Sequence, residues 1–209
     1  MKRLGKSSPC IIILVILLYA TAFAEQTINW KIPHNVRIVQ KSTKPDGVRT
    51  FNSIQAALNS ITNASPTNRH IVKIMPGIYS EPFQIQMKPF VDIIGASLNS
   101  SIILTENLLG HGIAPILGAE NTLLKDLTII GDTANYPGRC LEGNSIIIDS
   151  VIADCMVLIS DSTVKNSIIG RISASNSFLI NSQLKYIYDA SRKKIINCYD
   201  SSFNPIYNQ

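Results

Sequence analysis

Residues 71–104 decide the fold of this chain; they read IVKIMPGIYSEPFQIQMKPFVDIIGASLNSSIIL. Apolar residues gather in short runs rich in β-branched types, and a Pro-Gly pair and a later glycine separate the runs. Each run has the length of a strand, and none is long enough for a helix. Such short strands without crossover helices are typical of a sheet coiled on itself, in which each strand pairs with its equivalent one coil later. We interpret the stretch as the first full coil of a parallel β-helix.

The composition is that of an ordered single domain. The chain has 209 residues, of which 45% are hydrophobic and 16% are charged, and this balance favours a folded core over disorder. The formal net charge is +5, but three basic residues lie in the leader described next, and the remaining 16 basic and 14 acidic residues leave +2. Beyond the short basic run at 192–194 no stripe of Lys and Arg appears, so we expect no nucleic-acid partner.

The first 24 residues have the pattern of a secretory signal peptide. Basic residues precede an apolar run, and the sequence A-F-A at 22–24 is a small-x-small cleavage site. An uncleaved membrane anchor is the alternative, but the apolar run is shorter than the roughly 20 residues of a spanning helix. We expect residues 1–24 to be removed and residues 25–209 to form one secreted or periplasmic domain. A membrane contact is expected only through an uncleaved leader.

Three cysteines remain after the leader, Cys140, Cys155 and Cys198. An oxidising compartment permits disulfides, and an odd number leaves at least one thiol unpaired. We weigh burial of all three as small apolar thiols slightly above one disulfide. No Cys-x-x-Cys occurs and the three histidines are not spaced like metal ligands, so we expect no metal and no cofactor.

Upstream of residue 71 the sequence predicts a strand and then a helix. Residues 36–40 alternate like a strand. One helix face is predicted by the spacing i, i+3, i+4 and i+7 of Ile54, Ala57, Leu58 and Ile61. Asn52 followed by Gln55 resembles a capping box. A solenoid exposes its apolar interior at its ends, so we expect this amphipathic helix to cover the first coil.

The second half of the chain carries an internal repeat. An Asp or Asn, a small residue and apolar residues recur, and the steps from Asp161 to Asn176 and from Asn166 to Asn181 are both 15 residues. Asn and Asp suit tight corners because they bond to nearby backbone and tolerate left-handed conformations. The repeat therefore predicts further coils with stacked corners. We expect the tail at 203–207 to fold over the last coil, because an uncapped end exposes strand edges.

Two regions resemble pectin methylesterases. The sequence DGVRTFNSIQAAL at 46–58 is similar to the family's D-G-x-G…T-I-x-x-A helix, and VKIMPGIYSE at 72–81 is similar to its strand pair with G-x-Y-x-E. The likeness continues through 91–95 and 114–131, and covers roughly residues 46–136. It implies an all-β fold, the right-handed parallel β-helix of the pectin-lyase-like superfamily, with an N-terminal amphipathic capping helix.

The catalytic motifs of that family are missing from this chain. Pectin methylesterases use one Asp as nucleophile, a second as general acid/base, glutamine amides for the oxyanion and an Arg that orients the nucleophile. These groups lie in Q-A-V, Q-D-T, D-F-I-F-G and G-R-P-W motifs, and none of the four occurs here. At the position of Q-A-V this chain has RCL at 139–141, and at that of D-F-I-F-G it has IGRIS at 169–173. We therefore assign no catalytic residue.

Four residues are candidates for saccharide contact: Tyr136, Arg139, Asp154 and Arg171. The resemblance places Tyr136, Arg139 and Arg171 near the groove in which related proteins hold polysaccharide. Tyr offers a ring face and Arg a forked donor, both suited to sugars. An exposed Arg more often serves solubility, and an Asp at the head of a short strand is ordinary turn chemistry.

Three functions remain open on the sequence. The first is a catalytically inactive β-helix that binds an extended, pectin-like polysaccharide along a coil face, as a monomer. The second is an active carbohydrate esterase, a pectin methylesterase acting in cell-wall modification, with a divergent site of Asp149, Asp154 and Arg171. The third is a structural or adhesive surface protein. The missing motifs favour the first over the second, because loss of catalytic groups costs orders of magnitude in rate.

Overall fold

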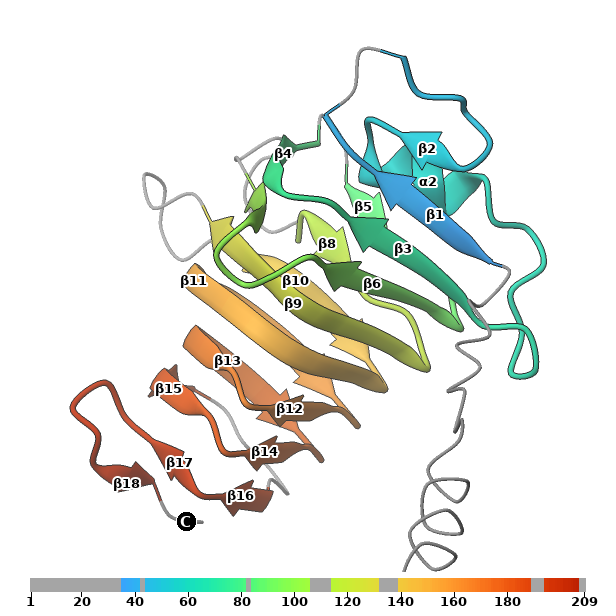
Figure 1. The fold of residues 1–209 in the computed structure, drawn as a ribbon. Helices are drawn as coiled ribbons and strands as arrows, with labels where there is room; N and C mark the ends of the chain where they lie inside the picture. Colours follow the sequence, from blue (N-terminus) through green and yellow to red (C-terminus); the bar gives the residue numbers. More distant parts are fainter. Residues whose placement is uncertain are drawn as a thin grey trace, which may run out of the picture. The chain divides into compact units, whose positions relative to one another are not determined.

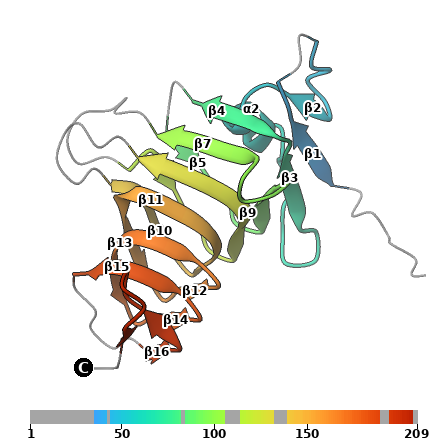
Figure 2. The ribbon, with the colours of Figure 1, turned by 60° about the vertical axis from the view of Figure 1, so that its left-hand side comes forward.

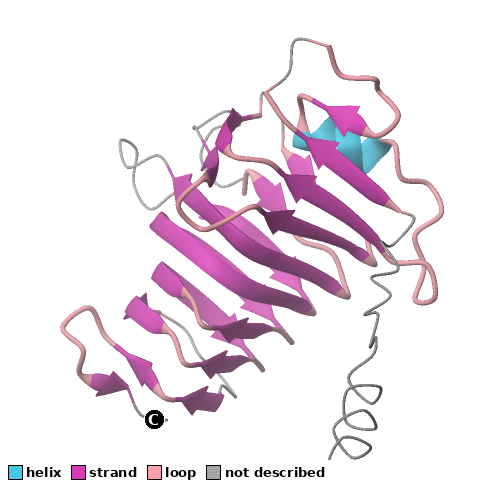
Figure 3. Cartoon of the chain, in the orientation of Figure 1, coloured by secondary structure: helices cyan, strands magenta, loops and turns pink. Residues whose placement is uncertain are grey.

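The computed structural model describes residues 35–41, 44–81, 84–105, 114–131, 139–188 and 194–206. These residues form a parallel β-helix whose coils stack one on the next (Figure 1). Strands make up almost all of the regular structure (Figure 3). The expected all-β, right-handed parallel β-helix is confirmed. The leader expected at residues 1–24 lies outside the described residues, and no helix within them is long and apolar enough to cross a membrane.

Each coil passes through three faces, which we name the first, second and third face in chain order. The first face consists of β1 (Val36–Val39), β3 (His70–Ile74), β6 (Val91–Gly95), the start of β9 (Thr122–Gly131), the start of β11 (Ile146–Ser160), β12 (Thr163–Lys165), β14 (Phe178–Ile180) and β16 (Lys194–Ile196). Neighbouring strands on this face are parallel. The short strand β2 (Thr50–Phe51) also pairs with β1.

The other two faces follow in each coil (Figure 2). The second face consists of β4 (Gly77–Ser80), β7 (Ser101–Thr105), the end of β9, the middle of β11, the start of β13 (Ile168–Ser175), the start of β15 (Gln183–Ile187) and β17 (Cys198–Tyr199). The third face consists of β5 (Ile85–Gln86), β8 (Ile116–Leu117), β10 (Arg139–Asn144) and the ends of β11, β13 and β15. The last strand, β18 (Pro205–Ile206), pairs antiparallel with β17.

The stretch at 71–104 is not the first coil. Strand β3 pairs with β6, with His70 opposite Val91, so this stretch contains one coil and the start of the next. An earlier coil already begins at β1, which pairs with β3. The strands themselves lie where the sequence predicts them.

The core consists of apolar side chains stacked in register from coil to coil. The ladder of the first face contains Val72, Ile93, Leu124, Ile148, Val164, Leu179 and Ile195. That of the second face contains Tyr79, Ile103, Ile129, Ile152, Ile169 and Leu184. That of the third face contains Ile85, Ile116, Leu141, Val157, Ile172 and Ile187. Because side chains alternate along a strand, the residues between these positions point outward.

Left-handed residues turn the chain at two kinds of corner, which recur in several coils. Positive φ angles between third and first face occur at Asn121, Ser145, Asp161 and Asn176, and between first and second face at Asp126, Asn166, Asn181 and Asn197. The side-chain amide of Asn176 donates to Asp161 at 2.5 Å, and that of Asn197 donates to Asn181 at 3.3 Å. Asn and Asp accept this conformation more readily than most residues. The predicted 15-residue repeat with stacked corners is confirmed.

A buried serine follows several of these corners and links the coils. The hydroxyls of Ser167 and Ser182 accept the backbone N–H of Ser150 and Ser167, respectively, in the preceding coil. Cys198 occupies the same place in the next coil, where its thiol donates to the Ile196 carbonyl as the Ser182 hydroxyl donates to that of Ile180. Burial raises the pKa of the Cys198 thiol. Cys198 therefore has a structural role in this ladder.

Cys140 and Cys155 form a disulfide between β10 and β11, with their Cα atoms 5.6 Å apart, whereas Cys198 is a buried free thiol. The prediction that all three cysteines are buried free thiols is therefore wrong for Cys140 and Cys155. The physical reason is the stacking of coils, which brings two interior positions 15 residues apart in sequence next to each other. Sequence spacing alone does not show which positions face inward.

The N-terminal helix α2 (Ile54–Asn59) contacts β1, β2, β3 and β5 through its buried side chains. It begins at Ser53, whose hydroxyl accepts the N–H of Ala56 at 3.1 Å. The cap expected at Asn52 is therefore misplaced by one residue. The Glu81 carboxylate holds this helix start, because it accepts the Ser53 hydroxyl and the Ile54 N–H. Sequence reasoning missed this contact because Glu81 follows the helix by a whole strand pair.

The tail covers the last coil only in part, because Ile206 packs against the core whereas Phe203 does not. Phe203 lies in the turn between β17 and β18, and its side chain is 76% exposed. Pro205 is also exposed, and Tyr207 lies outside the described residues. The antiparallel pairing of β18 with β17 holds this end of the chain at the last coil and leaves Phe203 in the exposed turn.

Acid is expected to destabilise the fold through His70. This side chain is 1% exposed, and burial together with the charge of Arg37 lowers its pKa. The unfolded chain therefore binds this proton more tightly, so the free energy of unfolding decreases as the pH drops below about 6.5 towards the lowered pKa of the folded state. Urea unfolding at about pH 7.5 and about pH 5.5 measures the decrease. The variant His70→Phe should show a smaller decrease, and an identical one would contradict this assignment.

Candidate functional site

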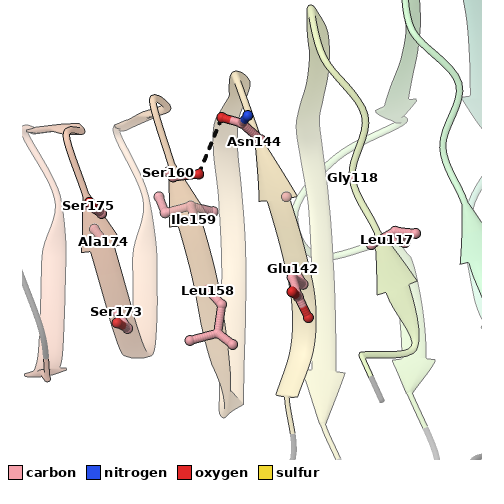
Figure 4. A pocket seen from close by; sticks show the side chains of 11 residues that line it. Leu117, Gly118, Glu142, Asn144, Leu158, Ile159, Ser160, Ser173, Ala174 and Ser175 are labelled. Atoms are coloured by element: carbon pink, nitrogen blue, oxygen red, sulfur yellow. Dashed lines mark hydrogen bonds between the residues drawn. The ribbon is translucent and has the colours of Figure 1, made fainter. Parts of the chain in front are cut away.

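The third face carries a groove on its outer surface (Figure 4). It has a volume of about 400 Å³ and is lined by Leu117, Gly118, Glu142, Gly143, Asn144, Leu158, Ile159, Ser160, Ser173, Ala174 and Ser175. Strands β8, β10, β11 and β13 contribute all of these residues except Gly118, which directly follows β8. A Cβ atom at Gly118 would lie 3.2 Å from the Gly143 Cα, so two glycines bring β8 and β10 together without side chains between them.

Outward side chains form rows across the third face, because equivalent positions of successive coils are in register. The middle row contains Leu117, Glu142, Leu158 and Ser173, and a second row contains Asn144, Ser160 and Ser175. The third row, which begins two residues earlier on β11 and β13, contains Met156, Arg171 and Tyr186, and the backbone of Arg139 lies opposite that of Met156. Neighbouring strands lie about 4.8 Å apart. Each row therefore repeats a contact position from coil to coil.

Polar groups and exposed rings meet on this face. The Ser160 hydroxyl donates to the Asn144 side-chain oxygen at 3.2 Å, as Figure 4 shows. Tyr186 is 52% exposed, and the Lys185 ammonium lies 5.5 Å from the centre of its ring. Tyr188 is 57% exposed, and its N–H donates to the Ile172 carbonyl, which places it beside Ser173. Two exposed tyrosines thus stand at the C-terminal end of the rows.

The structure brings two of the four sequence-predicted site residues onto one face. Arg139 and Arg171 are on the same face, with Met156 of β11 between them. Arg139 and Asp154 are placed here by their backbones only, and Tyr136 lies outside the described residues. Asp154 belongs to β11, between its second-face and third-face segments. The predicted role of these residues in saccharide contact stays a prediction.

The divergent esterase site considered from the sequence is not assembled. Asp149 lies opposite Lys125 on the first face, whereas Arg171 points outward on the third face. Within the described part of the chain, Glu142 is the one carboxylate that lines the groove. Hydrolysis by paired carboxylates needs two in unlike environments. In the same part of the chain, no cluster of His, Cys, Asp or Glu has the geometry to hold a metal ion.

Sequence reasoning missed Glu142, Tyr186 and Tyr188. The signal that would have found the tyrosines is the 15-residue repeat, since Met156, Arg171 and Tyr186 are spaced by it. Leu158, Ser173 and Tyr188 follow the same spacing two residues later. Glu142 was not detectable in this way, because the chain between β10 and the next coil has a different length and a register shift after Arg139.

Comparison with known proteins identifies the fold. No family profile matches the sequence, and no curated protein matches it. A candidate glycosyl hydrolase from Parabacteroides merdae aligns with 77% of this chain and 95% of its own, at 14% identity and a TM-score of 0.50. A pectin methylesterase mutant in complex with a hexasaccharide aligns with 79% of this chain, at 17% identity and a TM-score of 0.51. The alignment covers 60% of that esterase. The likeness shows a pectin-methylesterase-like β-helix fold.

Proposed function

We propose that this chain, a parallel β-helix with the fold of pectin methylesterases, binds an extended, pectin-like polysaccharide along its third face without chemical turnover. The observation that carries the proposal is the set of in-register rows, in which Arg171, Tyr186 and Tyr188 flank a groove with one carboxylate. The leader sequence predicts export, which would bring the domain to cell-wall material outside the cytoplasm. The fold likeness supports the proposal without carrying it.

Each class of side chain on the third face has a counterpart in a uronate polymer. The guanidinium of Arg171 presents forked donors to a carboxylate or to neighbouring hydroxyls. The rings of Tyr186 and Tyr188 offer flat apolar surfaces to the hydrophobic face of a sugar. Asn144, Ser173 and the other small polar residues exchange hydrogen bonds with hydroxyls. A polymer lying across the strands would meet these groups repeatedly.

Turnover would need groups that the described groove lacks. De-esterification through a nucleophilic Asp needs a second carboxyl group to transfer the proton and donors aimed at the developing oxyanion. Glu142 could serve one of these roles but not both at once. The lack of a second carboxyl group among the residues that line the groove agrees with the absence of the family's motifs from the sequence. We therefore favour a binding protein over an esterase.

Arg171→Ala is expected to weaken binding to oligogalacturonate by about 10- to 100-fold, because a hydrogen bond to a charged group contributes about 1.5–3 kcal/mol. Isothermal titration of residues 25–209 with oligogalacturonate measures the change. The control is Lys165→Ala, which removes a cation from the first face and should leave the affinity unchanged. Equal losses in both variants would indicate a non-specific charge effect and contradict the assigned site.

Methanol release from highly methyl-esterified pectin separates binding from turnover. The mature chain is expected to release none above background, since one carboxylate lines the described groove. The variants Glu142→Gln and Asp154→Asn accompany it as controls. Release that either variant abolished would establish the alternative function, an active carbohydrate esterase. Absence of both release and glycan binding would favour the structural or adhesive role.

A further inference from the structure

A second groove lies at the corner between the first and second faces, on the C-terminal coils. It has a volume of about 590 Å³ and is lined by Asn166, Ser167, Ile168, Asn181, Ser182, Gln183, Asn197, Tyr199 and Phe203. None of these lining residues carries a formal charge. The corner groove shares no lining residue with the groove of the third face.

Phe203 stands at the rim of the corner groove in an unfavourable backbone conformation. Its φ angle is 61°, which is rare for a bulky residue, and its side chain is 76% exposed, so core packing does not compensate for the strain. The ring of Phe203 lines the groove and does not contribute to the buried core.

The loop that carries Phe203 is held in place by Asp200. The Asp200 carboxylate accepts the backbone N–H of Ser202 at 2.8 Å and that of Asn204 at 2.9 Å, and also the Asn204 amide at 3.0 Å. The N–H of Phe203 itself donates to the Asp200 carbonyl at 3.1 Å. These bonds to the carboxylate lower the pKa of Asp200. The loop therefore presents the phenyl ring in a defined position.

The wall of the corner groove combines a second ring with a column of amides. Ile168, Gln183 and Tyr199 form one outward row of the second face, and Tyr199 is 43% exposed. Beside this row, the left-handed residues Asn166, Asn181 and Asn197 repeat from coil to coil. Two exposed rings thus face the same space as a series of carboxamide groups, each with donor and acceptor atoms.

We propose that the corner groove is a second saccharide-binding site and that its ligand is an uncharged glycan. Aromatic rings contact the apolar face of a sugar, and carboxamides exchange hydrogen bonds with its hydroxyls. A uronate would bring a carboxylate into a lining without cations, where no charge partner offsets its desolvation. The site would let the protein hold a neutral chain and a uronate chain on separate surfaces. The inference does not rest on the function proposed for the third face.

The test compares two variants against two kinds of ligand. Cellohexaose, xylohexaose and a galactan hexasaccharide serve as neutral probes, and oligogalacturonate serves as the charged probe, in titrations of residues 25–209. At least one neutral probe is expected to bind saturably. Phe203→Asn should weaken that binding about tenfold and leave the oligogalacturonate affinity unchanged. Arg171→Ala should do the reverse, so failure of one site is distinguishable from failure of the other.

The stability of Phe203→Asn shows whether a loss of binding could come from unfolding. Asn tolerates a positive φ better than Phe, so the melting temperature of the variant should be equal to or higher than that of the unsubstituted chain. Failure of all three neutral probes to bind, or equal binding by the unsubstituted chain and Phe203→Asn, would overturn the proposal. A dimer that Phe203→Asn dissociates, without any effect on glycan affinity, would assign the groove to a second copy of the chain and would also overturn it.

Discussion

Leu124→Ala is expected to lower the free energy of unfolding by about 2–5 kcal/mol, as large-to-small substitutions in packed cores do. Leu124 is 1% exposed and lies in the ladder of the first face, between Ile93 and Ile148 of the neighbouring coils. Truncation leaves a cavity between two coils, because the backbone hydrogen bonds of β9 prevent the strands from closing the gap. Urea unfolding of residues 25–209 measures the loss.

The adjacent residue provides a matched control. Leu123 is part of the same strand, but its side chain points outward and is half-buried. Leu123→Ala removes the same atoms and should cost about 1 kcal/mol or less. Similar losses of stability for the two variants would contradict the inward orientation of Leu124 and the outward orientation of Leu123.

Removal of the disulfide is expected to have the second largest effect. The double substitution of Cys140 and Cys155 by alanine should lower the free energy of unfolding by about 3 kcal/mol, the value expected for a closed loop of about 15 residues. Without the cross-link, the unfolded chain gains conformational freedom, and β10 and β11 are joined by hydrogen bonds and packing alone. Unfolding in urea with and without reductant measures the difference.

Cys198 supplies the control for the disulfide. Cys198→Ser should change stability by about 1 kcal/mol or less, because serine occupies the equivalent corner in the preceding coils and makes the same bonds. Titration of denatured, unreduced residues 25–209 should find one thiol, and titration after reduction should find three. Three thiols before reduction would contradict the Cys140–Cys155 pair.

The sequence predicted part of the candidate site through the family resemblance, and its repeat contained a further signal. The family resemblance singles out Arg139 and Arg171, and the strand register aligns their backbones on the third face, with Met156 between them. The tyrosines at 186 and 188 follow the 15-residue spacing and were within reach of the same reasoning. The same reasoning could not predict the corner groove, because the sequence led us to expect that Phe203 covers the core, whereas its side chain is exposed.

Features that depend on neighbouring residues can be predicted from the sequence, whereas features that depend on packing between coils cannot. Alternation of apolar residues and left-handed Asn and Asp corners depend on a few neighbouring residues, so the sequence alone determined the strands, the corners and the coiled architecture. Coil register depends on how whole coils pack, and irregularities after Arg139, Asp149 and Ile152 reset which residue faces outward. Only the tertiary structure could therefore decide that Cys140 pairs with Cys155 and which residues line the two grooves.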